Sequence, residues 1–289
     1  MDQIKLAHIS DLHFNAASFN PAQIFSKRWL GNLNSVLFRK SQFTYEGLAL
    51  LKDLFKKQGI SHILISGDIS TTSHKEEFLT GKAFVEELKK ENFEVITLPG
   101  NHDHYTKKAY KQKLFYHYFE PSFEQNSPFN LKDHGVAIKS LNQNWHLIVL
   151  DTTCLPKFLA SQGHFSPHIE KHLEEALTSL KGQNIILANH FPFFQHENLR
   201  KRLIRGDEMK KLFAAHPNIK LYLHGHTHRF CVADLRVNGL PIVLDPGSTC
   251  HRFKGGCHIL EIDSNGCHLG MFKWNEEEWK LFQQHQFNW

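Results

Sequence analysis

Residues 94–103 read Glu-Val-Ile-Thr-Leu-Pro-Gly-Asn-His-Asp. The stretch Glu94–Leu98 is mostly β-branched or apolar and predicts a buried strand. A glycine and three side chains able to bind metal or move a proton follow directly: Asn101, His102 and Asp103. In open α/β sheets, ligands bind beyond the carboxyl ends of strands, so we expect a functional site here.

The same arrangement, a short apolar strand followed by Asp, Asn or His, occurs at four other places. Asp11-Leu12-His13 follows Ile4–Ile9, and Gly67-Asp68 follows His62–Ser66. Asn189-His190 follows Ile185–Ala188, and Gly225-His226-Thr227-His228 follows Leu221–Leu223. Strands that share a sheet edge would bring these side chains together. In extended backbone, residues i and i+2 point to one side, so Asp11 and His13, and likewise His226 and His228, are expected to act as pairs.

The donor set consists of carboxylate, amide oxygen and imidazole, without thiolate. Such sets suit Mn, Fe, Zn or Co in a hydrolytic centre better than a structural zinc site. The chain has 22 His and only five Cys, and no two Cys are spaced as CxxC. A disulfide scaffold is therefore excluded, and a reducing compartment is expected.

Strands alternate with helical patterns over most of the chain, which favours an α/β fold. Helices are predicted at Phe43–Lys57, Glu76–Lys90, Tyr105–Phe119 and Pro167–Leu180, and another strand at Leu147–Leu150. Beyond residue 230, short strands joined by Asn238-Gly239 and Asn265-Gly266 predict a β-rich C-terminal third. Without internal repeats or a low-complexity linker, residues 1–289 are interpreted as a single domain.

Composition narrows the function further. With 41% hydrophobic residues, the chain can bury a sizeable core, which excludes a disordered or fibrous protein. A net charge of +5 is too small to indicate nucleic acid as a partner. The sequence shows no signal-peptide pattern and no apolar run of about 18–20 residues, so we expect a cytoplasmic protein.

The five motifs, in this order, resemble those of the calcineurin-like metallophosphoesterases, over residues 4 to about 250. The resemblance implies a two-layered β-sandwich flanked by α-helices, with a dinuclear metal site. It also implies ligand sets: Asp11, His13 and His228 for one ion, Asn101, His190 and His226 for the other, with Asp68 bridging both. His102 would face the substrate.

The expected reaction is hydrolysis of a phosphodiester or pyrophosphate by a hydroxide that bridges two divalent metal ions. We expect manganese ahead of iron, zinc or cobalt. His102 would protonate the leaving oxygen or stabilise charge on the phosphoryl group. A non-catalytic binding scaffold is a remote alternative, because none of the eight motif positions is missing.

Basic residues follow the metal motifs and indicate an anionic substrate. The segment 20–43 combines Lys and Arg with apolar residues at helical spacing and contains no acidic residue. It is interpreted either as an interfacial helix on an anionic membrane or as a helix packed on the core. Substrate-binding residues are predicted to be Arg28, Trp29, Arg202 and Arg205.

Two substrate classes remain open. The segment 20–43 favours an amphiphilic nucleotide-lipid such as UDP-2,3-diacylglucosamine, cleaved in lipid A biosynthesis by bacterial enzymes that the chain resembles, at the inner face of the membrane. One branch of those enzymes has Arg where this chain has His102. The alternative is a soluble phosphodiester such as a cyclic nucleotide.

Overall fold

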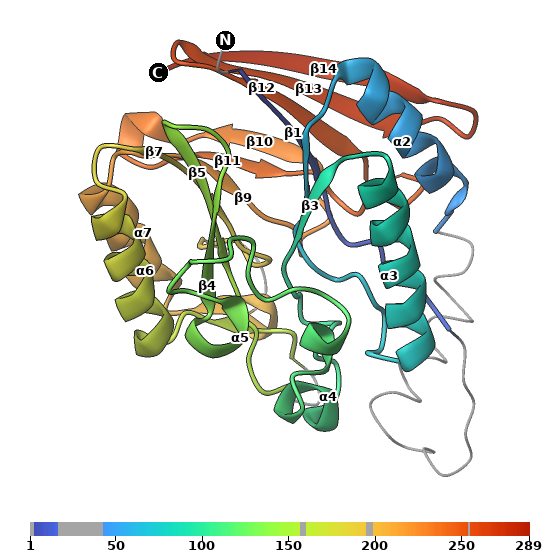
Figure 1. Ribbon diagram of the computed structural model, residues 1–289, viewed down its shortest axis with the longest axis horizontal. Helices are drawn as coiled ribbons and strands as arrows, with labels where there is room; N and C mark the ends of the chain where they lie inside the picture. The colour runs from blue at the N-terminus through green and yellow to red at the C-terminus, as the bar shows by residue number, and fades with distance from the viewer. Residues whose placement is uncertain (1–2, 17–42, 157–159, 195–198, 254) are drawn as a thin grey trace.

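Two six-stranded sheets lie face to face in the computed structural model, which describes residues 3–16, 43–156, 160–194, 199–253 and 255–289 (Figure 1). The first sheet has the order β14-β13-β12-β1-β2-β3 and the second β10-β11-β9-β7-β5-β4. A further pair is formed by β6 (Gly163–His164) and β8 (Leu203–Ile204). The first sheet comprises β1 (Ile4–Ile9), β2 (His62–Ile65), β3 (Glu94–Thr97), β12 (Cys257–Ile262), β13 (Gly266–Trp274) and β14 (Trp279–Asn288). The second comprises β4 (Val136–Ser140), β5 (Trp145–Leu150), β7 (Asn184–Ala188), β9 (Ile219–Leu223), β10 (Cys231–Asp234) and β11 (Ile242–Asp245).

The core is layered because strands point successive side chains to opposite faces. In β1, Leu6 packs between the two sheets with Leu147 and Ile186 of the second sheet. Its neighbour Ala7 packs on the other face, in the cluster that includes residues of α2 (Glu46–Gln58) and α3 (Lys75–Lys90). The second sheet is covered in the same way by α6 (Pro167–Ser179) and α7 (Gly206–Ala215). The predicted α/β sandwich flanked by helices is confirmed.

Parallel pairing fixes where the strands end. β1, β2 and β3 are parallel neighbours, and so are β5, β7, β9 and β11. Parallel strands bring their carboxyl ends to the same sheet edge. The predicted β-rich C-terminal third is confirmed too, since β10 to β14 follow one another after residue 230.

Local chemistry explains where the helices start and stop. The Ser166 side chain accepts from the Ile169 amide, and Pro167 occupies the first turn of α6. Gly59, with a φ of 68°, ends α2. The helix predicted at Tyr105–Phe119 is wrong in its middle. Lys113 takes a left-handed φ of 48°, so the segment forms α4 (Lys107–Lys111) and the 3-10 turn η3 (Leu114–His117).

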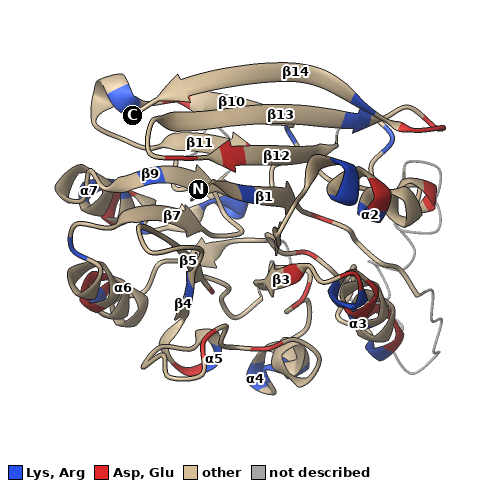
Figure 2. Ribbon diagram, turned by 45° about the horizontal axis from the view of Figure 1, so that its top comes forward, with Lys and Arg blue, Asp and Glu red and all other residues tan. Residues whose placement is uncertain are grey.

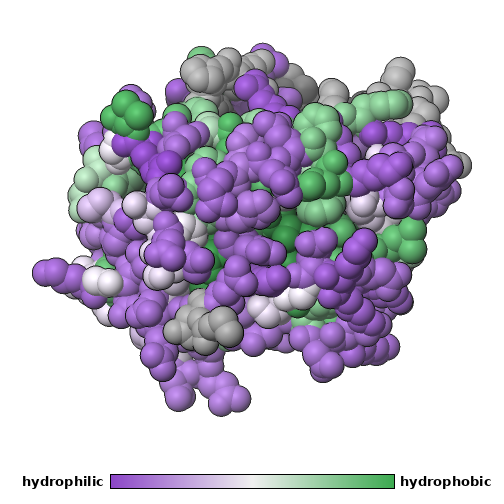
Figure 3. Space-filling view, turned by 90° about the horizontal axis from the view of Figure 1, so that it is seen from above, coloured by the Kyte–Doolittle hydropathy of each residue, from purple (hydrophilic) through white to green (hydrophobic). Residues whose placement is uncertain are grey.

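Charged residues lie mainly on helices and turns, while the inner strands are mostly uncharged (Figure 2). Seen from above, the surface is largely hydrophilic and is broken by separate hydrophobic side chains (Figure 3). Among the described residues, no helix is long and apolar enough to cross a membrane. Of the segment 20–43, only Phe43 belongs to the described residues. The single-domain interpretation stays a prediction.

Candidate metal centre

The strand ends bring together three overlapping groups of possible metal ligands. In each group the ligand atoms lie within 4.8 Å of one another. The groups are Asp11, His13 and His228; Asp68, His190 and His226; and His13, Asp68 and His102. The residues come from loops after β1, β2, β3, β7 and β9. Residues up to 217 positions apart in the chain therefore meet at one edge of the sandwich.

Asp68 lies between the first two groups. Its Oδ2 is 3.3 Å from His190 Nε2 and 3.9 Å from His13 Nε2. Its Oδ1 accepts a hydrogen bond of 2.7 Å from the His102 amide, which fixes the orientation of the carboxylate. The side chain is buried. One carboxylate oxygen thus faces imidazoles of both groups, the arrangement expected of a ligand shared by two cations.

The two carboxylate oxygens of Asp11 also have different partners. Oδ2 accepts from the Ser10 hydroxyl at 2.6 Å and from the His226 amide at 3.0 Å. Oδ1 lies 3.0 Å from His228 Nε2 and 3.6 Å from His13 Nε2. The oxygen nearest the imidazoles is therefore the one that can bind a metal ion.

Backbone carbonyls hold three of the imidazoles. His190 Nδ1 lies 2.8 Å from Ser66 O, and His226 Nε2 lies 3.0 Å from Lys201 O. His102 Nδ1 lies 2.6 Å from Thr71 O. A carbonyl can only accept, so each of these nitrogens carries a proton and the other ring nitrogen is left to bind a metal or a substrate. The sequence motifs do not indicate which backbone carbonyls would accept hydrogen bonds from these imidazoles.

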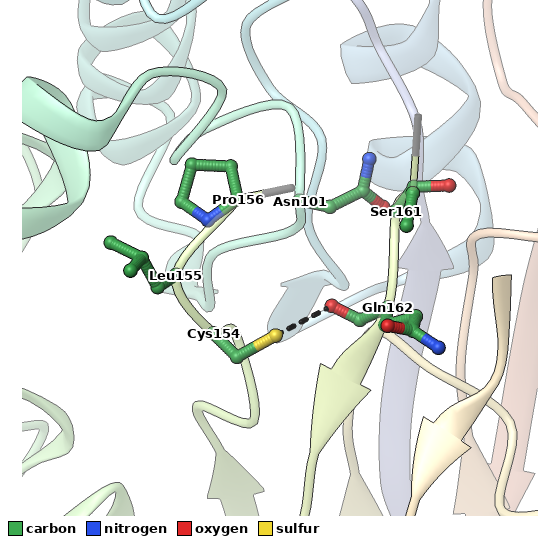
Figure 4. A pocket seen from close by; sticks show the side chains of 7 residues that line it. Asn101, Cys154, Leu155, Pro156, Ser161 and Gln162 are labelled. Carbon is green, nitrogen blue, oxygen red and sulfur yellow. Dashed lines mark hydrogen bonds between the residues drawn. The ribbon is translucent and has the colours of Figure 1, made fainter. Parts of the chain in front are cut away.

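Asn101 offers the amide oxygen that the sequence predicts as a ligand. Its Oδ1 is buried and has no hydrogen-bond partner among the described residues. A buried polar atom without a partner is costly unless a ligand satisfies it. The residue lies beside a small hollow that Cys154, Leu155, Pro156, Ser161 and Gln162 also line (Figure 4). This orphaned oxygen and the O/N donor set fit a divalent cation.

Two glycines allow the carboxylates to approach the backbone closely. A Cβ on Gly100 would lie 2.2 Å from Asp68 Oδ1. A Cβ on Gly225 would lie 1.9 Å from Ser10 Oγ and 2.4 Å from Asp11 Oδ2. The glycines that precede Asn101 and His226 are therefore required by space at these positions.

The extended backbone expected for Asp11-x-His13 and His226-x-His228 is wrong. The φ angles are 53° at Asp11, 50° at His13, 68° at His226 and 53° at His228. Each of these residues lies in the left-handed region, which non-glycine residues rarely adopt and which costs free energy. The turns do bring both members of each pair to the site, but through strained loops and not through strand alternation.

Burial and neighbouring charges set the protonation of the metal-free site. Burial lowers the pKa of His190, but the Asp68 carboxylate outweighs it and raises that pKa to about 9. Burial, with the nearby His190, lowers the pKa of His226 to about 3. Burial opposes ionisation of Asp68, yet the imidazoles of His190 and His102 hold its pKa well below the usual range. The carboxylate is thus available as a ligand.

The His102 ring packs against two aromatic neighbours. Tyr105 stacks on it, with centroids 5.3 Å apart and planes inclined by 22°. His13 meets it edge-on at 4.8 Å. The next residue, Asp103, does not orient His102: its carboxylate accepts from the amides of Ile69, Ser70 and Gly100. Burial, helped by Asp68, raises the pKa of Asp103 to about 7.

The substrate-binding role of the four predicted residues stays a prediction. Arg28 and Trp29 lie outside the described residues. Arg202 is exposed. Arg205 donates to Glu170 at 2.5 Å and to Phe165 O at 3.0 Å, so its guanidinium is engaged in holding α6 to the start of α7.

Comparison with known proteins agrees with this geometry. The family model described as calcineurin-like phosphoesterase matches residues 4–230. The chain belongs to this family. A curated relative is the 3',5'-cyclic adenosine monophosphate phosphodiesterase CpdA of Haemophilus influenzae, which is 26% identical over 215 residues. The match covers 70% of this chain and 66% of the relative, so the chain spans just under two thirds of that protein's length.

Solved structures support the fold. A dimetal phosphatase from Danio rerio superimposes with a TM-score of 0.69 at 12% identity, over 99% of this chain and 98% of that one. A purple acid phosphatase from yellow lupin (Lupinus luteus) seeds gives a TM-score of 0.62 at 12% identity, over 99% of this chain and 54% of that one.

Proposed function

We propose that this protein is a dinuclear-metal phosphodiesterase that acts on small anionic phosphodiesters. The observation that carries the proposal is the position of Asp68, whose Oδ2 faces imidazoles of both ligand groups. One ion would be held by Asp11, His13 and His228, the other by Asn101, His190 and His226, with Asp68 shared.

Two divalent cations, when bound, neutralise phosphate charge and lower the pKa of water. The protein's own residues supply orientation and a proton. Because the Nδ1–H group of His102 donates a hydrogen bond to Thr71 O, exchange of a proton with the substrate is assigned to Nε2. Stacking on Tyr105 keeps this ring in place, so the proton can be delivered to the leaving oxygen.

A cyclic nucleotide is our first candidate substrate. The support is the name of the Haemophilus influenzae relative, a 3',5'-cyclic adenosine monophosphate phosphodiesterase. Manganese is our first candidate metal, with iron, zinc and cobalt as alternatives, since oxygen and imidazole ligands accept all four.

The test uses the full chain, stripped of metal and reloaded with Mn²⁺. We expect two ions per chain and metal-dependent turnover of bis-(p-nitrophenyl) phosphate and 3',5'-cyclic AMP. Preference for the monoester p-nitrophenyl phosphate, or turnover that survives chelation, would contradict the proposal.

An amphiphilic nucleotide-lipid such as UDP-2,3-diacylglucosamine is the second candidate. It is favoured by two exposed apolar side chains, Leu155 and Leu199. Leu155 lines the hollow beside Asn101, and Leu199 lies two residues from Lys201, whose carbonyl holds His226. This candidate would place the protein in the cytoplasm, peripherally on the inner membrane face. It requires that the protein sediment with anionic liposomes and be released by salt; protein that never pellets would remove the membrane from the proposal.

A further inference from the structure

A second, larger cavity of about 310 Å³ lies among α4, α5 (Leu131–His134) and the start of α6. Its lining includes Tyr110 and Lys111 of α4, Asp151 and Thr153 beyond β5, and Ser166 at the start of α6. Cavities that hold small organic ligands have volumes of about 300–1,000 Å³, so this one is large enough for such a group. No residue of the proposed metal-ligand set lines it.

The cavity adjoins the metal centre. β5 and β7 are parallel neighbours, with Val149 opposite Ala188. Asp151 and His190 each lie two residues beyond that pair, and the Thr152 hydroxyl donates to Asn189 at 2.7 Å between them. Cys154 lines both this cavity and the hollow beside Asn101, where its thiol donates to Gln162 O at 3.1 Å (Figure 4).

The cavity is lined by aromatic side chains and by a carboxylate, Asp151, that other side chains hold in place. His104 meets Tyr110 edge-on at 5.6 Å and lies 6.5 Å from the Tyr116 ring. Asp151 Oδ2 accepts from the Tyr116 hydroxyl at 2.6 Å, and Oδ1 accepts from the Thr153 amide at 2.9 Å. The carboxylate is therefore held in one orientation before any ligand arrives.

This combination selects among the groups that a phosphodiester can carry. An acyl chain needs walls that are largely apolar, whereas only a few aliphatic side chains, such as Leu131 and Ile169, lie among the polar lining residues. A nucleobase presents a π-face that stacks on aromatic rings and an edge of hydrogen-bond donors. Both of these features have partners in this cavity.

We propose that the cavity holds the nucleoside of the substrate, with the base stacked on Tyr110 and hydrogen-bonded to Asp151. The assignment rests on the proposed phosphodiesterase function, because it places the phosphate of the same molecule at the metal centre. It adds to the proposed function the cavity and the residues that would recognise the nucleoside part of a nucleotide substrate.

The test compares Tyr110→Ala and Tyr110→Leu with the control Tyr118→Ala. Tyr118 is a tyrosine of the neighbouring segment whose ring stacks on Phe78 and does not line this cavity. Calorimetric titration of the wild-type protein with adenosine should show binding. Removing a stacked aromatic ring should weaken this binding about tenfold in both Tyr110 variants and leave it unchanged in the control. The ratio of kcat/KM for cyclic AMP to that for bis-(p-nitrophenyl) phosphate should fall by the same factor.

Three results would overturn the assignment: no adenosine binding by the wild type, wild-type binding by folded Tyr110→Leu, or an equal loss of octyl phosphate binding in the Tyr110 variants. Melting curves establish that each variant is folded. Adenosine carries no phosphate, so its titration reports on the cavity alone. Failure of bis-(p-nitrophenyl) phosphate turnover would instead count against the phosphodiesterase function.

Discussion

Asp68 Oδ2 lies 3.3 Å from His190 Nε2, and the two residues come from the ends of strands in different sheets. β2 belongs to the first sheet and β7 to the second, so the candidate metal centre spans the seam between the layers of the sandwich. Its geometry therefore depends on how the sheets pack and not on one loop.

Replacing the shared carboxylate should abolish turnover. Asp68→Asn removes the negative charge that would hold both metal ions. The ions would stabilise the transition state by several kcal/mol, so we expect kcat to fall on the order of 10³-fold. Metal content, measured by mass spectrometry, should fall below two ions per chain. Asp53→Asn, at an exposed position of α2, is the matched control. Near-normal kcat in metal-loaded Asp68→Asn would remove Asp68 from the site.

His102→Ala should separate proton transfer from metal binding. We expect kcat to fall by roughly 10²–10⁴-fold while metal content is kept. The loss should be smaller for bis-(p-nitrophenyl) phosphate, whose leaving group departs readily as an anion, than for cyclic AMP. If the variant instead loses metal, His102 is a ligand and not the acid.

Metal affinity should depend on pH through His190. Without metal its pKa is about 9, so the imidazole is protonated below that value, and metal binding must expel the proton. The apparent Kd should therefore rise as the pH falls below 9, by up to about tenfold per unit for this one proton. Titration with Mn²⁺ at several pH values measures the slope. A Kd independent of pH between 7 and about 9 would exclude His190 as a ligand.

Gly100→Ala tests the space beside Asp68. The added Cβ would lie 2.2 Å from Asp68 Oδ1, so the carboxylate must shift. We expect a loss of about 1–3 kcal/mol in the free energy of unfolding, together with weaker metal binding. At Gly182 an added Cβ meets nothing within 4 Å, so Gly182→Ala is the comparison variant without a steric clash. Equal metal affinity in the two variants would contradict the steric argument.

Much of the fold was predictable because short apolar runs in the sequence indicate buried strands. The ends of those runs also indicated which residues meet. The route by which they meet was not predictable, because the left-handed φ of Asp11 and His226 depends on contacts made by their neighbours in the folded chain.

Two other features show the same limit. Lys201 O holds His226, which is 25 residues away in the sequence. Every residue has a backbone carbonyl, so the residue types do not reveal this contact. Arg205 follows a metal motif in a basic cluster, but its pairing with Glu170 on α6 is a tertiary contact. Charge clustering could suggest a substrate-binding role for it, and only the packed structure reveals its partner.

The Asp103 carboxylate accepts hydrogen bonds from the amides of Ile69, Ser70 and Gly100. It fastens the loop that carries Asp68 to the loop that carries Asn101. The two loops are therefore fixed in position relative to each other. Damage to this fastening would disturb both metal positions together, although no coordinating side chain had been altered.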